Sequence, residues 1–117
     1  MSIFDPTNPS SQKYPQVQPT TTLVGPTGDG GPVDCTGFRQ ISLQGEVTTA
    51  GGAGSTIEVD GLFADSGTWQ ALGGTMPLSV VGPFRLFAGG PVPATVRVRW
   101  NVVGGNPVVS YSLLGQS

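Results

Sequence analysis

Histidine is absent from this sequence of 117 residues, and cysteine occurs once, at Cys35. Without histidine, the chain lacks the commonest general base, the commonest zinc ligand and every histidine-dependent catalytic triad. A single cysteine excludes a disulfide within the chain. We therefore expect no enzyme, no cofactor and no metal site, and we expect Cys35 to behave as a small buried apolar residue.

Charge is also scarce, because charged residues make up 10% of the chain against a usual share of about 25%. The net charge is −2, and the four arginines and one lysine form no cluster, so the basic patch typical of nucleic-acid-binding proteins is missing. No apolar run approaches the ~20 residues that span a bilayer. No basic stretch followed by an apolar run indicates a signal peptide. These absences predict a soluble protein made in the cytoplasm, without a nucleic-acid or membrane partner.

Proline is abundant near the N-terminus, where six of the eleven prolines lie between Pro6 and Pro32. Proline fixes φ and favours an extended predecessor, so residues 1–33 are expected to form an extended arm with one short strand at Thr20–Gly25. Such an arm is either a disordered tail or a segment that becomes ordered on a partner. In the second case, the apolar residues expected to contact the partner are Ile3, Phe4, Tyr14, Val17, Leu23 and Val24.

Residues 34–117 alternate between apolar and polar side chains, which is the period of a half-buried strand. Strands are expected at residues 38–47, 55–64, 68–72, 83–88, 94–103 and 107–114. Gly104 and Gly105, between the last two, predict a hairpin turn. Because each strand has one apolar face, a second sheet must cover it. We therefore predict an all-β fold, an antiparallel β-sandwich with a jelly-roll-like arrangement, preceded by the extended proline-rich arm.

Three carboxylates, Glu58, Asp60 and Asp65, lie within eight positions in the stretch "EVDGLFAD". A glycosidase pair would need a cleft, and a calcium loop would need ligands where Leu62 and Phe63 lie. We interpret Glu58 and Asp60 as the solvent side of a strand, followed by a turn at residues 65–67 in which Gly67 takes the left-handed conformation.

Arg97 and Arg99 lie two positions apart on one face of a predicted strand. Two positive charges make a weak anion site. Pairing across strands with Glu58, Asp60 or Glu46 is the preferred interpretation.

Three stretches, "FADSGTWQAL", "GPFRLF" and "ATVRVRWNVVGGNPVVSYSLL", follow one another between Phe63 and Leu114. Their order resembles that of small β-sandwich virion proteins of tailed bacteriophages. The resemblance covers residues 37–114 and depends mainly on Gly67, Trp69, Phe84, Arg85 and residues 96–99. It implies a non-enzymatic protein of the virion that decorates or cements the capsid, or belongs to a neck, tail or head fibre. It offers no catalytic residue.

The resemblance also implies partners, namely the major capsid protein or other virion proteins. A homo-oligomer is expected, preferably a trimer, because decoration proteins often occupy local threefold positions. The proline-rich arm suits a cement protein, since an extended segment can pair with the strand edge of a neighbouring subunit.

The alternative function is a carbohydrate- or receptor-binding module of a phage tail or head fibre. Trp69 and Trp100 would then be stacking platforms, with Asp60 or Arg99 as polar partners. Trp100 shares its strand face with Val96 and Val98, which favours a place in the core. Trp69 lies beside a turn and is the aromatic residue expected at a contact surface.

Overall fold

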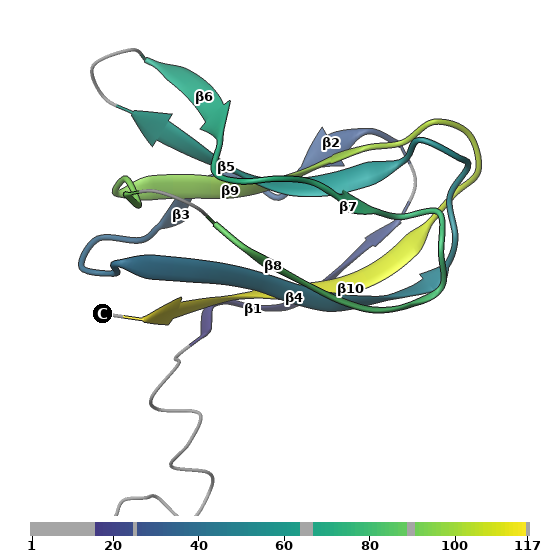
Figure 1. Cartoon of the computed structure of the whole chain (residues 1–117), viewed down its shortest axis with the longest axis horizontal. Coiled ribbons are helices and arrows are strands. Elements are labelled where there is room, and N and C mark those ends of the chain that lie inside the picture. Colours follow the sequence, from purple (N-terminus) through teal and green to yellow (C-terminus); the bar gives the residue numbers. More distant parts are fainter. Residues whose placement is uncertain (1–15, 25, 64–66, 89–90, 117) are drawn as a thin grey trace, which may run out of the picture.

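The computed structural model describes residues 16–24, 26–63, 67–88 and 91–116; at residues 16–20 and 24 it describes the backbone only. These ranges contain strands and turns but no helix. The strands form two antiparallel sheets that pack face to face (Figure 1). The predicted all-β sandwich is confirmed.

The first sheet has four strands in the order β1-β10-β4-β8. Their bounds are Gln16–Val24 (β1), Val108–Gln116 (β10), Gln40–Thr49 (β4) and Gly82–Phe87 (β8). We call it the four-stranded sheet; it is the lower layer in Figure 1.

The second sheet has six strands, of which β2-β9-β5-β6 form the continuous order, while β3 pairs with β9 and β7 with β5. Their bounds are Gly28–Asp29 (β2), Val33–Asp34 (β3), Thr56–Phe63 (β5), Thr68–Ala71 (β6), Met76–Pro77 (β7) and Thr95–Asn101 (β9). We call it the six-stranded sheet.

The strand pairs are nested in the chain. The first strand, β1, pairs with the last, β10. Inside this pair β2 and β3 pair with β9, then β4 pairs with β8, and the innermost pair is β5 with β6. A long antiparallel ribbon rolled up in this way is a jelly roll, so the predicted jelly-roll-like arrangement is confirmed.

The core lies between the sheets and follows the predicted alternation. The four-stranded sheet contributes Ile41, Leu43 and Val47 from β4, and the six-stranded sheet contributes Val96 and Val98 from β9, all at most 1% exposed. Other buried residues include Ile57, Val59, Val109, Tyr111 and Leu113. The strands that supply these residues therefore bury the apolar face that the sequence indicated, because alternate side chains point to opposite sides of a sheet.

The predicted hairpin at Gly104-Gly105 is wrong. β9 belongs to the six-stranded sheet and β10 to the four-stranded sheet, so this turn carries the chain from one layer to the other. The two glycines have φ of 77° and 72°, which glycine adopts without steric cost. The turn is held by the loop before β5: Gly52 N–H donates to the Gly104 carbonyl (2.9 Å), and Val103 N–H donates to Ser55 Oγ (2.9 Å).

Strand pairing begins earlier in the chain than the predicted division into an arm (1–33) and a sandwich (34–117). The expected short strand at Thr20–Gly25 overlaps the longer β1, which ends at Val24, whereas Gly25 lies outside the described residues; β2 and β3 also start before residue 34. Pro19 fits because β1 is an edge strand with register irregularities between Gln16 and Thr21, and edges and bulges tolerate a residue that lacks an N–H.

Candidate functional site

Charged side chains gather on the outer face of the six-stranded sheet. Of the twelve acidic and basic residues in the chain, five lie here on three neighbouring strands, in the registers Asp29–Arg99–Glu58 and Arg97–Asp60. We call this surface the charged face; its members are Asp29, Glu58, Asp60, Arg97 and Arg99. Acidic and basic residues alternate from strand to strand, so each charge has an opposite charge beside it.

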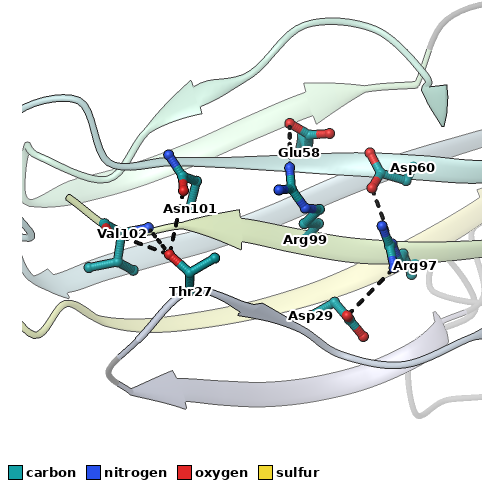
Figure 2. Close-up of polar contacts among 8 residues, drawn as sticks. All are labelled: Thr27, Asp29, Glu58, Asp60, Arg97, Arg99, Asn101 and Val102. Atoms are coloured by element: carbon teal, nitrogen blue, oxygen red, sulfur yellow. Dashed lines mark hydrogen bonds and ion pairs between the residues drawn. The ribbon is translucent and has the colours of Figure 1, made fainter. Parts of the chain in front are cut away.

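Arg97 is the centre of this network (Figure 2). Its Nε lies 3.1 Å from Asp60 Oδ2, and its Nη1 lies 3.6 Å from Asp29 Oδ2. Arg99 forms a looser pair, with Nη1 at 3.9 Å from Glu58 Oε1. The predicted cross-strand pairing of both arginines with Glu58 and Asp60 is confirmed, whereas Glu46 lies on β4 in the other sheet.

Asp29 reaches Arg97 because two hydrogen bonds fix the short edge strand β2 against β9. Trp100 Nε1 donates to the Pro26 carbonyl at 2.9 Å, and Val102 N–H donates to Thr27 Oγ1 at 2.8 Å. The second of these bonds also appears in Figure 2. Both bonds join side chains to backbone, which explains how a strand of only two residues keeps its position.

The prediction that Asp60 faces solvent is wrong, because Asp60 is 3% exposed. The guanidinium carbon of Arg97 lies 4.4 Å from the centre of the Trp69 ring. Since β5 lies between β6, which carries Trp69, and β9, which carries Arg97, the stacked pair spans β5 at the level of Asp60. The alternation correctly assigned Asp60 to the outer face, but a neighbouring tryptophan covers that face.

One oxygen of Asp60, Oδ1, is buried and has no hydrogen-bond partner among the described groups. A buried polar atom in this state is unfavourable. Glu58 lies two positions away on the same strand face, and its pKa is raised to about 7. The main cause is a side-chain hydrogen bond with Asp60, followed by burial and by the negative charge of Asp60; Arg99 and Arg97 oppose the rise. In its protonated form Glu58 can donate this hydrogen bond to the Asp60 carboxylate.

A carboxyl with a pKa near 7 is suited to general acid catalysis, but the described surroundings of Glu58 and Asp60 do not favour catalysis by this pair. Two hollows in the described part of the chain lie on the outer face of the other sheet, and the residues that line them include neither Glu58 nor Asp60. Both carboxyls are engaged with arginines, and Asp60 is inaccessible. In residues 16–116, the gaps excepted, no group of three or more histidine, cysteine or acidic residues is placed to hold a metal ion. The arrangement is that of an ion-pair network.

The residues predicted to contact a partner fall into three groups. Ile3, Phe4 and Tyr14 lie outside the described residues, as do the side chains of Val17 and Val24, whose backbones belong to β1. Leu23 is 4% exposed and lies in the core, so its side chain is already buried within the chain. Trp69 is half-buried and stacks on Arg97.

The remaining predictions concern Trp100, Cys35 and the turn at residues 65–67. Trp100 packs against the core, with its ring 6.0 Å from that of Tyr111, as its strand face indicated. Cys35 is buried, and burial, with the nearby charge of Asp34, raises the pKa of its thiol to about 11. Residues 65 and 66 lie outside the described ranges, but Gly67 has a φ of 67°, as predicted.

Two hollows on the outer face of the four-stranded sheet were not predicted from the sequence. The larger has a volume of about 540 Å³ and is lined by residues of β4, β8 and β10, among them the polar residues Gln44, Glu46, Arg85, Ser110 and Ser112. The smaller, of about 40 Å³, is bordered by Ser42, Phe87 and Leu114. The strand pattern marks these residues as outward-facing, but the curvature that forms a hollow depends on the tertiary fold.

No family model and no curated protein matches this chain. Among the described residues no helix is long and apolar enough to cross a membrane.

Proposed function

We propose that this chain is a non-enzymatic structural protein of a bacteriophage virion, of the decoration or cement type, which binds the head shell. The observation that carries the proposal is the jelly-roll strand order, which recurs in viral capsid domains and also in lectins and cupins. This support is by analogy of fold, because one fold serves many functions. Among these classes we choose a virion protein because the sequence pattern resembles that of small phage virion proteins.

The charged face supports a role without catalysis. Its acidic and basic groups form ion pairs with one another, so they are engaged in the fold rather than presented to a substrate. On this proposal the partners are the major capsid protein or another virion protein, together with further copies of the chain in a preferred trimer. The protein would be located in the virion.

The test is binding to head shells of a tailed phage from which the gene for this protein has been deleted. Purified protein is mixed with the shells, and the bound fraction is measured after sedimentation. We expect saturable binding, and we expect deletion of residues 1–15 to weaken it at least tenfold. The deletion ends there because Gln16–Val24 form β1. Absence of binding by the full chain would contradict the proposal.

A carbohydrate- or receptor-binding role is the second candidate, and the hollow of about 540 Å³ favours it, because its glutamine, serine and arginine side chains can hydrogen-bond sugar hydroxyls. The residues named from the sequence fit less well, since Arg97 stacks on Trp69 and Trp100 packs against the core. Binding to a glycan array, repeated with Gln44→Ala, tests this role. Capture of one glycan by the wild type and its loss in the variant would favour it over the decoration role.

A further inference from the structure

Strand β8 leaves one edge of the four-stranded sheet open. In the part of the chain that the structure describes, β8 pairs with β4 alone. Ala88 N–H donates to the Ile41 carbonyl at 2.9 Å, and in an antiparallel pair the backbone groups of alternate residues then point away from the partner. Pro83, Arg85 and Phe87 direct their backbone groups outward, with N–H donors at Arg85 and Phe87. We call this side of β8, together with Val80 and Val81, the β8 edge.

The side chains along the β8 edge are unusually apolar for an exposed surface. Val80, Val81 and Phe87 are 60–65% exposed, and the described residues include only one other large apolar side chain more than half exposed, Val103 at 51%. An open strand edge bordered by apolar side chains is a template for a further strand.

Charge adds a second requirement for the added strand. Arg85 is exposed, and its side chain contacts the Gln44 amide oxygen at 3.5 Å. None of the ion pairs among the described residues involves Arg85. A strand that suits this edge therefore combines bulky apolar residues with a carboxylate that can lie near Arg85.

The first five residues of the chain, Met1-Ser2-Ile3-Phe4-Asp5, have this composition. They contain no proline, so each N–H is available to a strand partner. Residues 6–15 connect them to β1, and ten extended residues reach about 30–35 Å. We propose that residues 1–5 of one copy of this chain add as a strand to the β8 edge of a second copy.

The alternative is that residues 1–5 add to the β8 edge of their own chain. Gln16 and Phe87 lie in one row across the four-stranded sheet, through Leu114 and Ser42, so about 14 Å separates them. A return to the chain's own β8 would require a reversal directly before β1 and a crossing of the sheet face. Pro15 precedes Gln16, and Pro6 and Pro9 lie within the connection; each proline favours an extended predecessor. The sequence therefore favours a continuation to a neighbouring copy.

Each copy would donate one segment and receive one, reciprocally in a two-fold dimer or head to tail in a larger assembly. This inference goes beyond the proposed function, because it concerns contact between copies and does not depend on a virion. Failure of shell binding would leave it intact.

The first experiment tests whether residue 5 of one copy meets residue 85 of another. Asp5→Cys and Arg85→Cys proteins are mixed and oxidised; the native Cys35 is buried and stays unreactive. We expect a disulfide between positions 5 and 85, identified by mass spectrometry. The control pair, Asp5→Cys with Ala53→Cys, uses an exposed loop position and should yield at least tenfold less product.

The double variant Asp5→Cys/Arg85→Cys separates the two sources of the strand. Linked dimers and higher species support exchange between copies. A linked monomer as the main product, or no link between positions 5 and 85 in either format, would overturn the proposal.

The second experiment measures self-association of the full chain by sedimentation equilibrium. We expect Phe87→Ser and Phe4→Ser each to weaken association at least tenfold, while Val103→Ser leaves it unchanged. Circular dichroism checks that each variant keeps its strands. If Phe87→Ser weakens association and Phe4→Ser does not, the β8 edge binds something other than the N-terminal segment, and the proposal is wrong. It is equally wrong if neither variant weakens association.

Discussion

Replacing Glu58 by glutamine should remove most of the pH dependence of folding between pH 5 and pH 8. In the folded protein the pKa of Glu58 is raised from 4.5 to about 7, chiefly by its hydrogen bond with Asp60. The folded state therefore binds more protons than the unfolded state across this interval, so stability falls as pH rises. The contribution of protonated Glu58 is fully present below about pH 4.5 and is lost as pH passes 7.

The rise in the pKa of Glu58 from 4.5 to about 7 corresponds to about 3 kcal/mol of folding free energy, at about 1.4 kcal/mol for each pKa unit. Since 17% of the Glu58 side chain is exposed, solvent screens the interaction only in part, and about 3 kcal/mol is an upper value. Glutamine donates a hydrogen bond to Asp60 at every pH. Glu58→Gln should therefore match the wild type near pH 5 and exceed its free energy of unfolding by about 1–3 kcal/mol at pH 8.

Urea unfolding followed by tryptophan fluorescence, repeated from pH 5 to pH 8.5, measures this difference. Histidine and cysteine do not add to the pH dependence in this range, because the chain has no histidine and the thiol of Cys35 has a pKa of about 11. Glu46→Gln, on the exposed side of the other sheet, is the matched control and should keep the wild-type slope. Equal slopes for the wild type and Glu58→Gln would refute the assignment of the proton to Glu58.

Three further predictions concern folding. Arg97→Ala should lower the free energy of unfolding by about 3 kcal/mol in urea titrations, because it leaves the buried carboxylate of Asp60 without its ion-pair partner; a loss below 0.5 kcal/mol would contradict this role. Gly45→Ala should lower the free energy of unfolding by about 2 kcal/mol or more, because a β-carbon there would overlap the Ser110 carbonyl and crowd the Phe84 ring. Gly74→Ala is the control and should be nearly neutral, because there is open space around Gly74. Equal melting temperatures for the two variants would argue against this packing. Cys35 should resist an aromatic disulfide reagent at pH 8 until urea unfolds the chain, because its thiol is buried and has a raised pKa; rapid labelling of the folded protein would contradict this placement.

The sequence predicted the strands of the core because alternation reports which face of a strand is buried. It did not predict the two-residue strands β2, β3 and β7, which are too short to show a period. The connection at Gly104-Gly105 was misread because a glycine pair permits a tight turn within a sheet and also a crossing between sheets. The crossing between sheets is fixed by the hydrogen bond between Gly104 and Gly52, which lies about fifty positions away in the chain.

The exposure of the residues on the charged face was likewise not predictable from the sequence. Alternation placed Glu58 and Asp60 on the outer side of β5 and made the two arginines their natural partners, as observed. Exposure was misjudged because it depends on Trp69, which belongs to another strand and spans β5 to stack on Arg97. A tryptophan beside a turn gives no sign of which neighbour it will cover.

The two outer faces of the sandwich differ in what they offer to another molecule. On the six-stranded sheet, five of the few charged side chains are paired with one another, and a partner that used them would first have to break these ion pairs. On the four-stranded sheet, the hollows and the β8 edge present polar, apolar and backbone groups, and none of the ion pairs among the described residues involves them. Substitutions on the charged face should therefore act on folding, whereas substitutions at the β8 edge should act on association. Because apolar contacts and backbone hydrogen bonds would supply most of that association, with a single Asp–Arg pair beside them, we expect it to depend only weakly on salt.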